Sequence, residues 1–190
     1  PDEKVPERLN LATKQIMADA KQNPNIFPGG TFHGLFGGGD IPFIKPEMIR
    51  DFVEVIGDPT FDLYPSMVYK DVMEKRFPES RRTYGKLVEG SLCMGDITLL
   101  DFSMVEERLP QVRILRKNRK KFVTTIFKFA PMIAVRFILR RMSIKHLEDG
   151  ANKVFKVKCK FIEVPYAELA MDIDKPQQLD MALEEFQTLK

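Results

Sequence analysis

Hydrophobic residues recur every three or four positions in several stretches of the chain, which is the period of a helix with one buried face. The clearest case follows Pro46, where the apolar stripe consists of Met48, Ile49, Phe52, Val53 and Ile56. The period also predicts a first helix over Pro6–Gln22, with an apolar face made of Leu9, Ala12, Ile16, Met17 and Ala20. A last helix should begin at Pro176 and bury Leu179, Leu183 and Phe186. Further helices are predicted over Asp71–Phe77, near Met104, over Gln111–Met142 with a break at Pro131, and from Ser143 to about Asn152.

Extended segments alternate with these helices. Short apolar runs predict strands over Phe32–Phe36, Phe61–Tyr69, Thr83–Glu89 and Leu169–Ile173. Pro65 favours a sheet edge for the second of these, because proline cannot donate to a strand ladder. Gly95-Asp96 predicts a turn that opens a strand over Ile97–Leu100. In Lys156–Val164, lysines alternate with Val157, Cys159 and Phe161, which is the period of a strand with one buried face. The pattern indicates an α/β or α+β protein with a mixed sheet.

Composition supports a folded protein without selecting a function. The 190 residues are 44% hydrophobic and 30% charged, which excludes disordered and collagen-like chains. The two cysteines, Cys93 and Cys159, lack CxxC spacing, so neither a disulfide framework nor a thiolate zinc site is indicated. The isolated His33 and His146 give no support to a catalytic histidine pair. We expect a cytoplasmic protein.

The charges are distributed unevenly. Arg108 to His146 contains twelve Lys and Arg residues and no Asp or Glu, although the net charge of the chain is only +3. This basic block also contains apolar runs, and it suggests an anionic partner such as a membrane surface, which would make the protein membrane-peripheral. The alternative is structural, with helices packed on the sheet or on a second copy in a homodimer. Nucleic acid is disfavoured as a partner because no reading motif is present.

Two acidic motifs carry the candidate chemistry. Asp40-Ile41-Pro42 and Asp172-Ile173-Asp174-Lys175-Pro176 each follow an apolar segment and precede a predicted helix. Such positions lie at strand ends, where α/β sheets bind ligands, and carboxylates suit Mg²⁺ bound to a phosphate substrate. Each motif has an ordinary alternative: Asp40 in an Asx turn, and Asp174 as the N-cap of the last helix.

The order of these motifs resembles a known family. Gly39 to Glu47, Gly95 to Asp101, and Pro165 to Leu179 are similar to the later part of the MobA-like nucleotidyltransferases, and most of all to a bacterial subgroup known only as nucleotidyltransferase family proteins. The resemblance implies a Rossmann-like GT-A fold, with a three-layer mixed sheet. It also implies transfer of a nucleotidyl group from an NTP to a phosphorylated or acidic acceptor, with release of pyrophosphate.

The resemblance assigns roles to individual residues. Asp40 matches the acid that holds Mg²⁺ in this family, and Asp174 matches the acid that often supplies the second ligand. Gly95-Asp96 falls where the subgroup usually has Gly-Gly-Asn beside the acceptor, so the aspartate is a departure. The resemblance therefore implies Asp40 and Asp174 as catalytic metal ligands and Gly95 and Asp96 as acceptor-binding residues, with Asp172 a poorer metal candidate.

The largest departure from the family is at the front of the chain. Nothing in Pro1 to Gly39 resembles the Gly-rich loop with Arg and Lys that holds the nucleotide. We therefore expect residues 1–190 to be a single nucleotidyltransferase-like domain that is incomplete at its N-terminus, with a basic helical insertion at about 108–152.

Two other functions stay open. The chain could be a non-catalytic GT-A-like module that binds an anionic partner through Arg108 to His146. It could also be a glycosyltransferase, because Asp172-Ile173-Asp174 has the Asp-x-Asp spacing of the related metal motif, although the motif occurs late in the chain.

Overall fold

A computed structural model describes residues 5–22, 33–105, 107–108 and 131–188. Its centre is a five-stranded mixed sheet of the order β1-β4-β2-β5, with β3 paired to β4 outside this path. The strands are β1 (His33–Gly37), β2 (Leu63–Tyr69), β3 (Gly85–Lys86), β4 (Ser91–Asp101) and β5 (Ile162–Glu163). β4 is antiparallel to both β1 and β2, and β2 is parallel to β5. β1, β2 and β5 therefore run in one direction, and the predicted mixed α/β sheet is confirmed.

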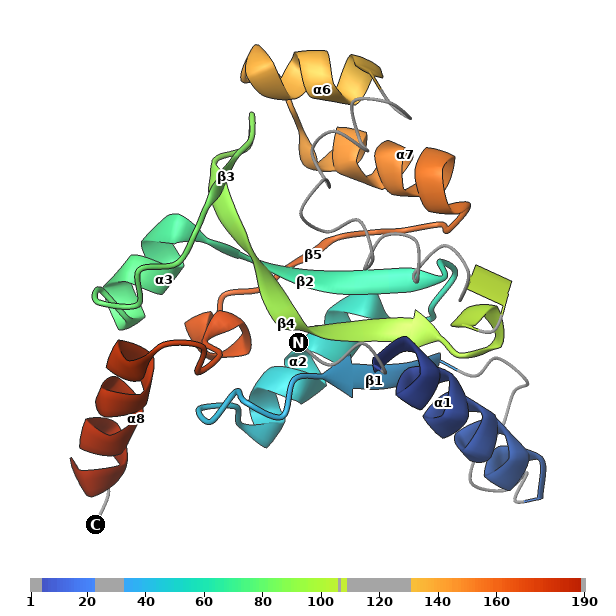
Figure 1. Cartoon of the computed structure of the whole chain (residues 1–190), viewed down its shortest axis with the longest axis horizontal. Helices are drawn as coiled ribbons and strands as arrows, with labels where there is room; N and C mark the ends of the chain where they lie inside the picture. Colours follow the sequence, from blue (N-terminus) through green and yellow to red (C-terminus); the bar gives the residue numbers. More distant parts are fainter. Residues whose placement is uncertain (1–4, 23–32, 106, 109–130, 189–190) are drawn as a thin grey trace.

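Helices surround this sheet (Figure 1). They are α1 (Val5–Gln22), α2 (Pro46–Ile56), α3 (Lys70–Arg76), α6 (Pro131–Ile138), α7 (Ile144–Phe155) and α8 (Pro176–Thr188). In Figure 1, α6 and α7 lie together at one end of the molecule, and α1 and α8 extend from the other. α7 begins with a capping box, because the Ser143 hydroxyl accepts from the His146 amide and the His146 ring accepts from the Ser143 amide.

The main core packs α2, α3, residues 167–171 and one position of α8 against the sheet. Met48 and Phe52 are the buried positions of the α2 stripe, while Val53 is 40% exposed. They belong to one cluster with Tyr64 and Val68 of β2. Burying a side chain of this size contributes roughly 1.5–3 kcal/mol, so the pattern after Pro46 both forms the helix and anchors it.

Pro65 does not mark an edge strand. β2 lies inside the sheet between β4 and β5, so the prediction of an edge position is wrong. The pairing of β2 with β4 shifts register between Pro65 and Met67. Pro65 itself pairs with Thr98 directly before this irregularity, and such places tolerate a proline within a sheet.

The predicted turn at Gly95-Asp96 is also absent. Both residues lie inside β4, which runs without interruption from Ser91 to Asp101. Gly95 is needed there because a Cβ would lie 2.1 Å from the Ser66 hydroxyl oxygen and 3.1 Å from the Leu169 carbonyl oxygen. A glycine within a strand often marks such a close approach rather than a turn.

Two other strand predictions require correction. Residues 167–170 form the 3-10 helix η2 (Ala167–Ala170), whereas a strand was expected over Leu169–Ile173. A short, fully buried apolar run has no periodicity that separates strand from helix, and Leu169 and Ala170 are completely buried. In Lys156–Val164 the predicted burial of Val157 and Cys159 is confirmed, but only β5 and one isolated bridge form ladder pairs.

The terminal helices bury only part of the faces predicted for them. In α8, Leu179, Leu183 and Phe186 are 43–51% exposed, and Gln178 and Ala182 are buried instead. In α1, Ile16 is exposed and Thr13 is buried, while Met17 packs on Leu100, Phe102 and Val105. Phe186 nevertheless stacks on Phe43, with a distance of 5.6 Å between the ring centroids.

Part of the basic block falls outside the described residues. This applies to residues 109–130, and therefore to most of the helical pattern predicted over Gln111–Met142. The described part contains α6, which begins at the predicted break, Pro131, and α7. None of the helices in the described ranges is long and apolar enough to cross a membrane. Cys93 and Cys159 are both buried free thiols.

Candidate active site

The candidate site lies at the end of the sheet where β1, β2 and β5 terminate. Because these three strands run in the same direction, their carboxyl ends lie on the same side of the sheet. Open α/β sheets bind ligands at this side. Asp40 follows the end of β1, and its carbonyl oxygen accepts a hydrogen bond of 3.0 Å from the Ile173 amide. This bond joins the two acidic motifs directly. The two motifs are far apart in the sequence and lie side by side in the fold.

Asp96 is the third acid of this site. It reaches the edge from the middle of β4, where its carbonyl oxygen accepts from the Gly38 amide at 3.2 Å. Burial is the main cause that raises the pKa of Asp96 above the ordinary carboxyl value. Arg82 opposes that rise, and the negative charges of Asp40 and Asp174 add to it. Asp40, Asp96 and Asp174 therefore share one electrostatic environment.

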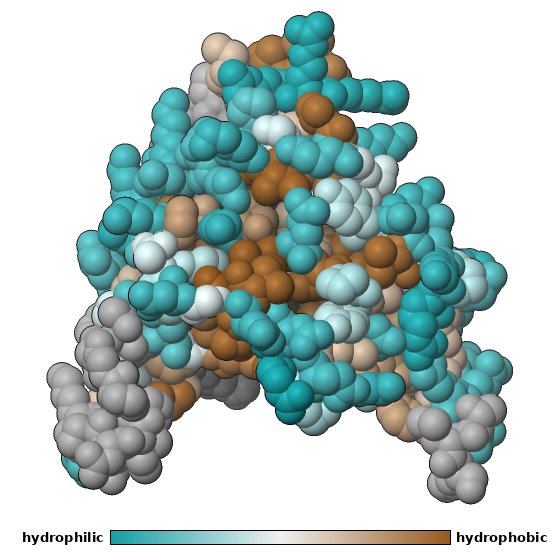
Figure 2. Space-filling model, turned by 180° about the vertical axis from the view of Figure 1, so that it is seen from behind, coloured by the Kyte–Doolittle hydropathy of each residue, from teal (hydrophilic) through white to brown (hydrophobic). Residues whose placement is uncertain are grey.

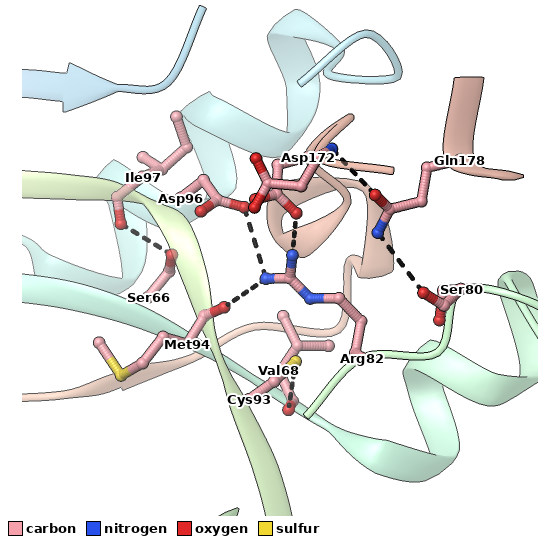
Figure 3. Close-up of polar contacts among 11 residues, drawn as sticks. Ser66, Val68, Ser80, Arg82, Cys93, Met94, Asp96, Ile97, Asp172 and Gln178 are labelled. Atoms are coloured by element: carbon pink, nitrogen blue, oxygen red, sulfur yellow. Dashed lines mark hydrogen bonds and ion pairs between the residues drawn. The ribbon is translucent and has the colours of Figure 1, made fainter. Parts of the chain in front are cut away.

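Arg82 is the cation of this acidic group. Its guanidinium donates to the Asp172 carboxylate and, at 3.2 Å, to the Met94 carbonyl oxygen (Figure 3). The same nitrogen that contacts Met94 lies 3.7 Å from Oδ2 of Asp96. Arg82 thus holds Asp172, the acid that sequence reasoning ranked below Asp174, in an ion pair.

Gln178 holds the segment that carries Asp174. Its side-chain oxygen accepts from the amides of Asp174 and Lys175 at 2.9 and 2.8 Å, and its side-chain nitrogen donates to the Ser80 carbonyl oxygen at 3.4 Å. The side chain is buried, and Figure 3 shows it reaching from α8 to Ser80. It therefore fixes the backbone beside the candidate metal ligand.

Sequence reasoning missed this role of Gln178. The first helical hydrogen bonds of α8 are accepted by the Lys175 carbonyl, so Lys175 rather than Asp174 is the N-cap. A glutamine three residues after the N-cap can bond back to the N-cap amide as half of a capping box. That spacing was a usable signal, but a lysine N-cap lacks the hydroxyl that normally completes the pattern.

The predicted acceptor-binding pair divides into two environments. Gly95 packs against Ser66, a fully buried residue whose hydroxyl donates to the Ile97 carbonyl at 2.7 Å. Asp96 points to Arg82 and is half-buried. Only the Asp96 side chain therefore offers a polar group to a ligand.

The chemistry of the site can be compared with the needs of Mg²⁺. Asp40 and Asp174 are exposed, and Asp96 has a buried carboxylate oxygen, Oδ2, that lacks a hydrogen-bond partner among the described residues. In the described ranges, no three His, Cys, Asp or Glu side chains are grouped closely enough to hold a metal ion by themselves. Mg²⁺ usually takes one or two carboxylates and completes its shell with water and substrate phosphates. The residues therefore fit Mg²⁺ that arrives with a phosphate substrate.

The fold has a counterpart among solved structures. No protein-family model and no curated protein matches the chain. A structure from Thermus thermophilus described as a hypothetical transferase is similar, with 28% sequence identity and a TM-score of 0.70, over 86% of this chain and 68% of the other. The chain therefore has a transferase-like α/β fold.

Proposed function

We propose that this chain belongs to a transferase, and that its reaction is Mg²⁺-dependent nucleotidyl transfer from an NTP to a phosphorylated or acidic acceptor. The observation that carries the proposal is the hydrogen bond between Ile173 and Asp40, which brings the Asp40 and Asp174 segments together at the carboxyl edge of the sheet. The similarity to a hypothetical transferase and the resemblance of the motifs to MobA-like nucleotidyltransferases support it.

The proposal gives a role to Asp40, Asp174, Gln178 and Asp96 in the candidate site. Asp40 and Asp174 would hold Mg²⁺, which supplies charge neutralisation for the triphosphate and polarises the phosphorus under attack. Gln178 fixes the Asp174 backbone, so that this carboxylate needs little reordering to bind. Asp96 faces the same site and is the side chain available to orient an acceptor hydroxyl or amine. Phosphoryl chemistry of this kind relies on positioning and electrostatics more than on covalent help.

The test is pyrophosphate release by the intact protein. Each of the four common NTPs is supplied with Mg²⁺ and a mixture of phosphorylated small molecules, and the Asp40→Asn variant is compared with Asp58→Asn. Asp58 is an exposed carboxylate beyond the end of α2. We expect Asp40→Asn to lose at least ~100-fold in rate, because one transition-state charge contact is worth that much, and Asp58→Asn to stay near wild type. Equal rates for the two variants would refute the mechanism.

A second function is favoured by the surface of α6. In α6 and directly after its end, Met132, Val135, Ile138 and Leu139 are 47–66% exposed, and Arg136, Arg140 and Arg141 are their neighbours in the sequence. Figure 2 shows apolar and hydrophilic side chains intermixed at the end of the molecule where α6 lies. We propose that this cationic, apolar surface docks on anionic membranes, since such surfaces combine apolar insertion with attraction to lipid charge.

Co-sedimentation with vesicles tests this second function. Vesicles rich in phosphatidylserine should bind the protein, and vesicles of phosphatidylcholine should not. Ile138→Ser should weaken binding about tenfold, which matches the loss of one large apolar contact. Leu11→Ser, which changes an exposed leucine of α1, serves as the control. Identical binding by the two variants, or binding to neutral vesicles alone, would rule out α6 as the docking surface.

A further inference from the structure

The Arg82 guanidinium is surrounded by groups that already satisfy it. It contacts the Asp172 carboxylate, the Met94 carbonyl oxygen at 3.2 Å and Oδ2 of Asp96 at 3.7 Å. The side chain of Arg82 is only 16% exposed. Figure 3 shows the guanidinium between the strand that carries Asp96 and the segment that carries Asp172. It therefore lies inside the acidic group rather than on the outer surface.

The loop that carries Arg82 is held in place by the opposite segment. The Lys175 side chain donates to the Arg81 carbonyl oxygen at 3.3 Å, and Gln178 donates to the carbonyl oxygen of Ser80, a buried residue. Arg81 has a φ of 48°, a left-handed conformation that is uncommon for residues other than glycine. The residue directly before Arg82 is therefore held in a strained backbone conformation, which argues against an incidental surface ion pair at Arg82.

Arg82 lies beside carboxylates that would also attract a divalent cation. Asp96 and Asp172 contact Arg82, and the charges of Asp40 and Asp174 act on Asp96. A guanidinium and a metal ion that lie close together repel each other, so occupancy by one lowers the affinity for the other. Arginine also presents a planar fork of donors that matches phosphate oxygens.

From this geometry we infer that Arg82 is an exchangeable counter-cation, which neutralises Asp96 and Asp172 in the free site and binds a substrate phosphate once a divalent cation is held there. The inference rests on the proposed function for the identity of the ligands. It assigns Arg82 as the residue that couples metal binding to phosphate binding. A purely structural ion pair would have no such coupling.

The coupling predicts opposite effects on the two ligands. Binding of Mn²⁺ alone is measured by electron paramagnetic resonance of the free ion. Arg82→Gln should bind Mn²⁺ at least about tenfold more tightly than wild type does, because a competing positive charge is removed. Binding of inorganic pyrophosphate in the presence of Mg²⁺ should be about tenfold weaker for the same variant. The matched control is Arg81→Gln, whose side chain is exposed and which should change neither affinity by more than about twofold.

A second variant covers a failure of Arg82→Gln to fold. Asp172→Asn keeps the arginine and releases it from its closest carboxylate, so pyrophosphate binding without metal should become tighter. Weaker pyrophosphate binding by Asp172→Asn would overturn the inference. If the ion pair only supports the structure of the site, removal of either Arg82 or Asp172 should weaken pyrophosphate binding. Unchanged or weaker Mn²⁺ binding by folded Arg82→Gln would also overturn it.

The failure of this inference can be distinguished from the failure of the proposed function. If Asp40→Asn abolishes Mn²⁺ binding but Arg82→Gln leaves it unchanged, the metal site stands and the role of Arg82 is wrong. If Asp40→Asn binds Mn²⁺ as wild type does, while Arg82→Gln binds it more tightly, the competition stands and the assignment of Asp40 is wrong.

Discussion

Replacement of Gln178 by methionine should destabilise the protein far more than the same replacement one residue earlier. Methionine has nearly the same length as glutamine and a similar helix propensity, so the change removes polar atoms with little change in shape. Gln178 is 2% exposed, and its amide makes three hydrogen bonds to backbone groups of Asp174, Lys175 and Ser80. Gln177, its neighbour on α8, is exposed and serves as the matched control.

The expected magnitude follows from these bonds. A hydrogen bond contributes about 0.5–1.5 kcal/mol net, and more when a buried partner is left unsatisfied. The two amides lie near the surface and can regain water, whereas the carbonyl of Ser80 belongs to a buried residue. We therefore expect Gln178→Met to lower the free energy of unfolding by about 2–4 kcal/mol, and Gln177→Met to change it by less than about 0.5 kcal/mol.

Urea unfolding followed by circular dichroism measures both variants, with the slope m checked to ensure that the comparison is two-state. Mn²⁺ binding should also weaken in Gln178→Met, because the Asp174 backbone loses its fixed position. Equal unfolding free energies for the two variants would show that the Gln178 network does not exist in solution, and would remove the argument that Asp174 is preorganised.

Three further changes test other parts of the structure. Gly95→Ala should cost about 1–3 kcal/mol, because its Cβ would meet the Ser66 hydroxyl oxygen at 2.1 Å, whereas Gly39→Ala, with nothing within 4 Å, should be nearly neutral in the same unfolding assay. Asp96→Asn should be more stable than wild type at pH 7. Folding raises the pKa of Asp96, so the ionised carboxylate destabilises the folded protein at any pH above the ordinary carboxyl pKa. The stability gain of Asp96→Asn should therefore shrink as the pH falls to 4. A gain that is independent of pH would contradict this cause. Ser143→Ala removes the side-chain cap of α7 and should lower the unfolding free energy by about 1 kcal/mol, and an unchanged value would show that the capping box contributes nothing.

The sequence predicted best those features that depend on local pattern. The apolar stripe after Pro46, the cap at Ser143 and the start of α8 at Pro176 are set by neighbouring residues, and all three are present in the structure. Features set by distant contacts were not predictable in this way. Gly95 looks like a turn until Ser66 is known to pack against it, and Pro65 suggests an edge until the register shift is seen.

The candidate site shows the same division. The acidic motifs could be recognised because their order in the chain resembles that of a family, and the structure joins their backbones. The contacts of Arg82 with Asp172 and of Gln178 with Ser80 link the loop before β3 to α8 and to the segment before it. No sequence period encodes such a contact, since it depends on how two loops meet at the end of a sheet. The apolar residues of α8 misled for a related reason, because a wide apolar face does not show which part of it is covered.

The central claim, that Asp40 and Asp174 hold the same metal ion for nucleotidyl transfer, is tested most directly by a double-mutant cycle. Mg²⁺-dependent release of pyrophosphate by the intact protein is measured for Asp40→Asn, Asp174→Asn and the double variant. If both carboxylates serve one ion, each single variant loses most of the activity, and the double variant is no slower than the slower single variant. Losses that multiply independently, or activity that survives both changes, would contradict the claim.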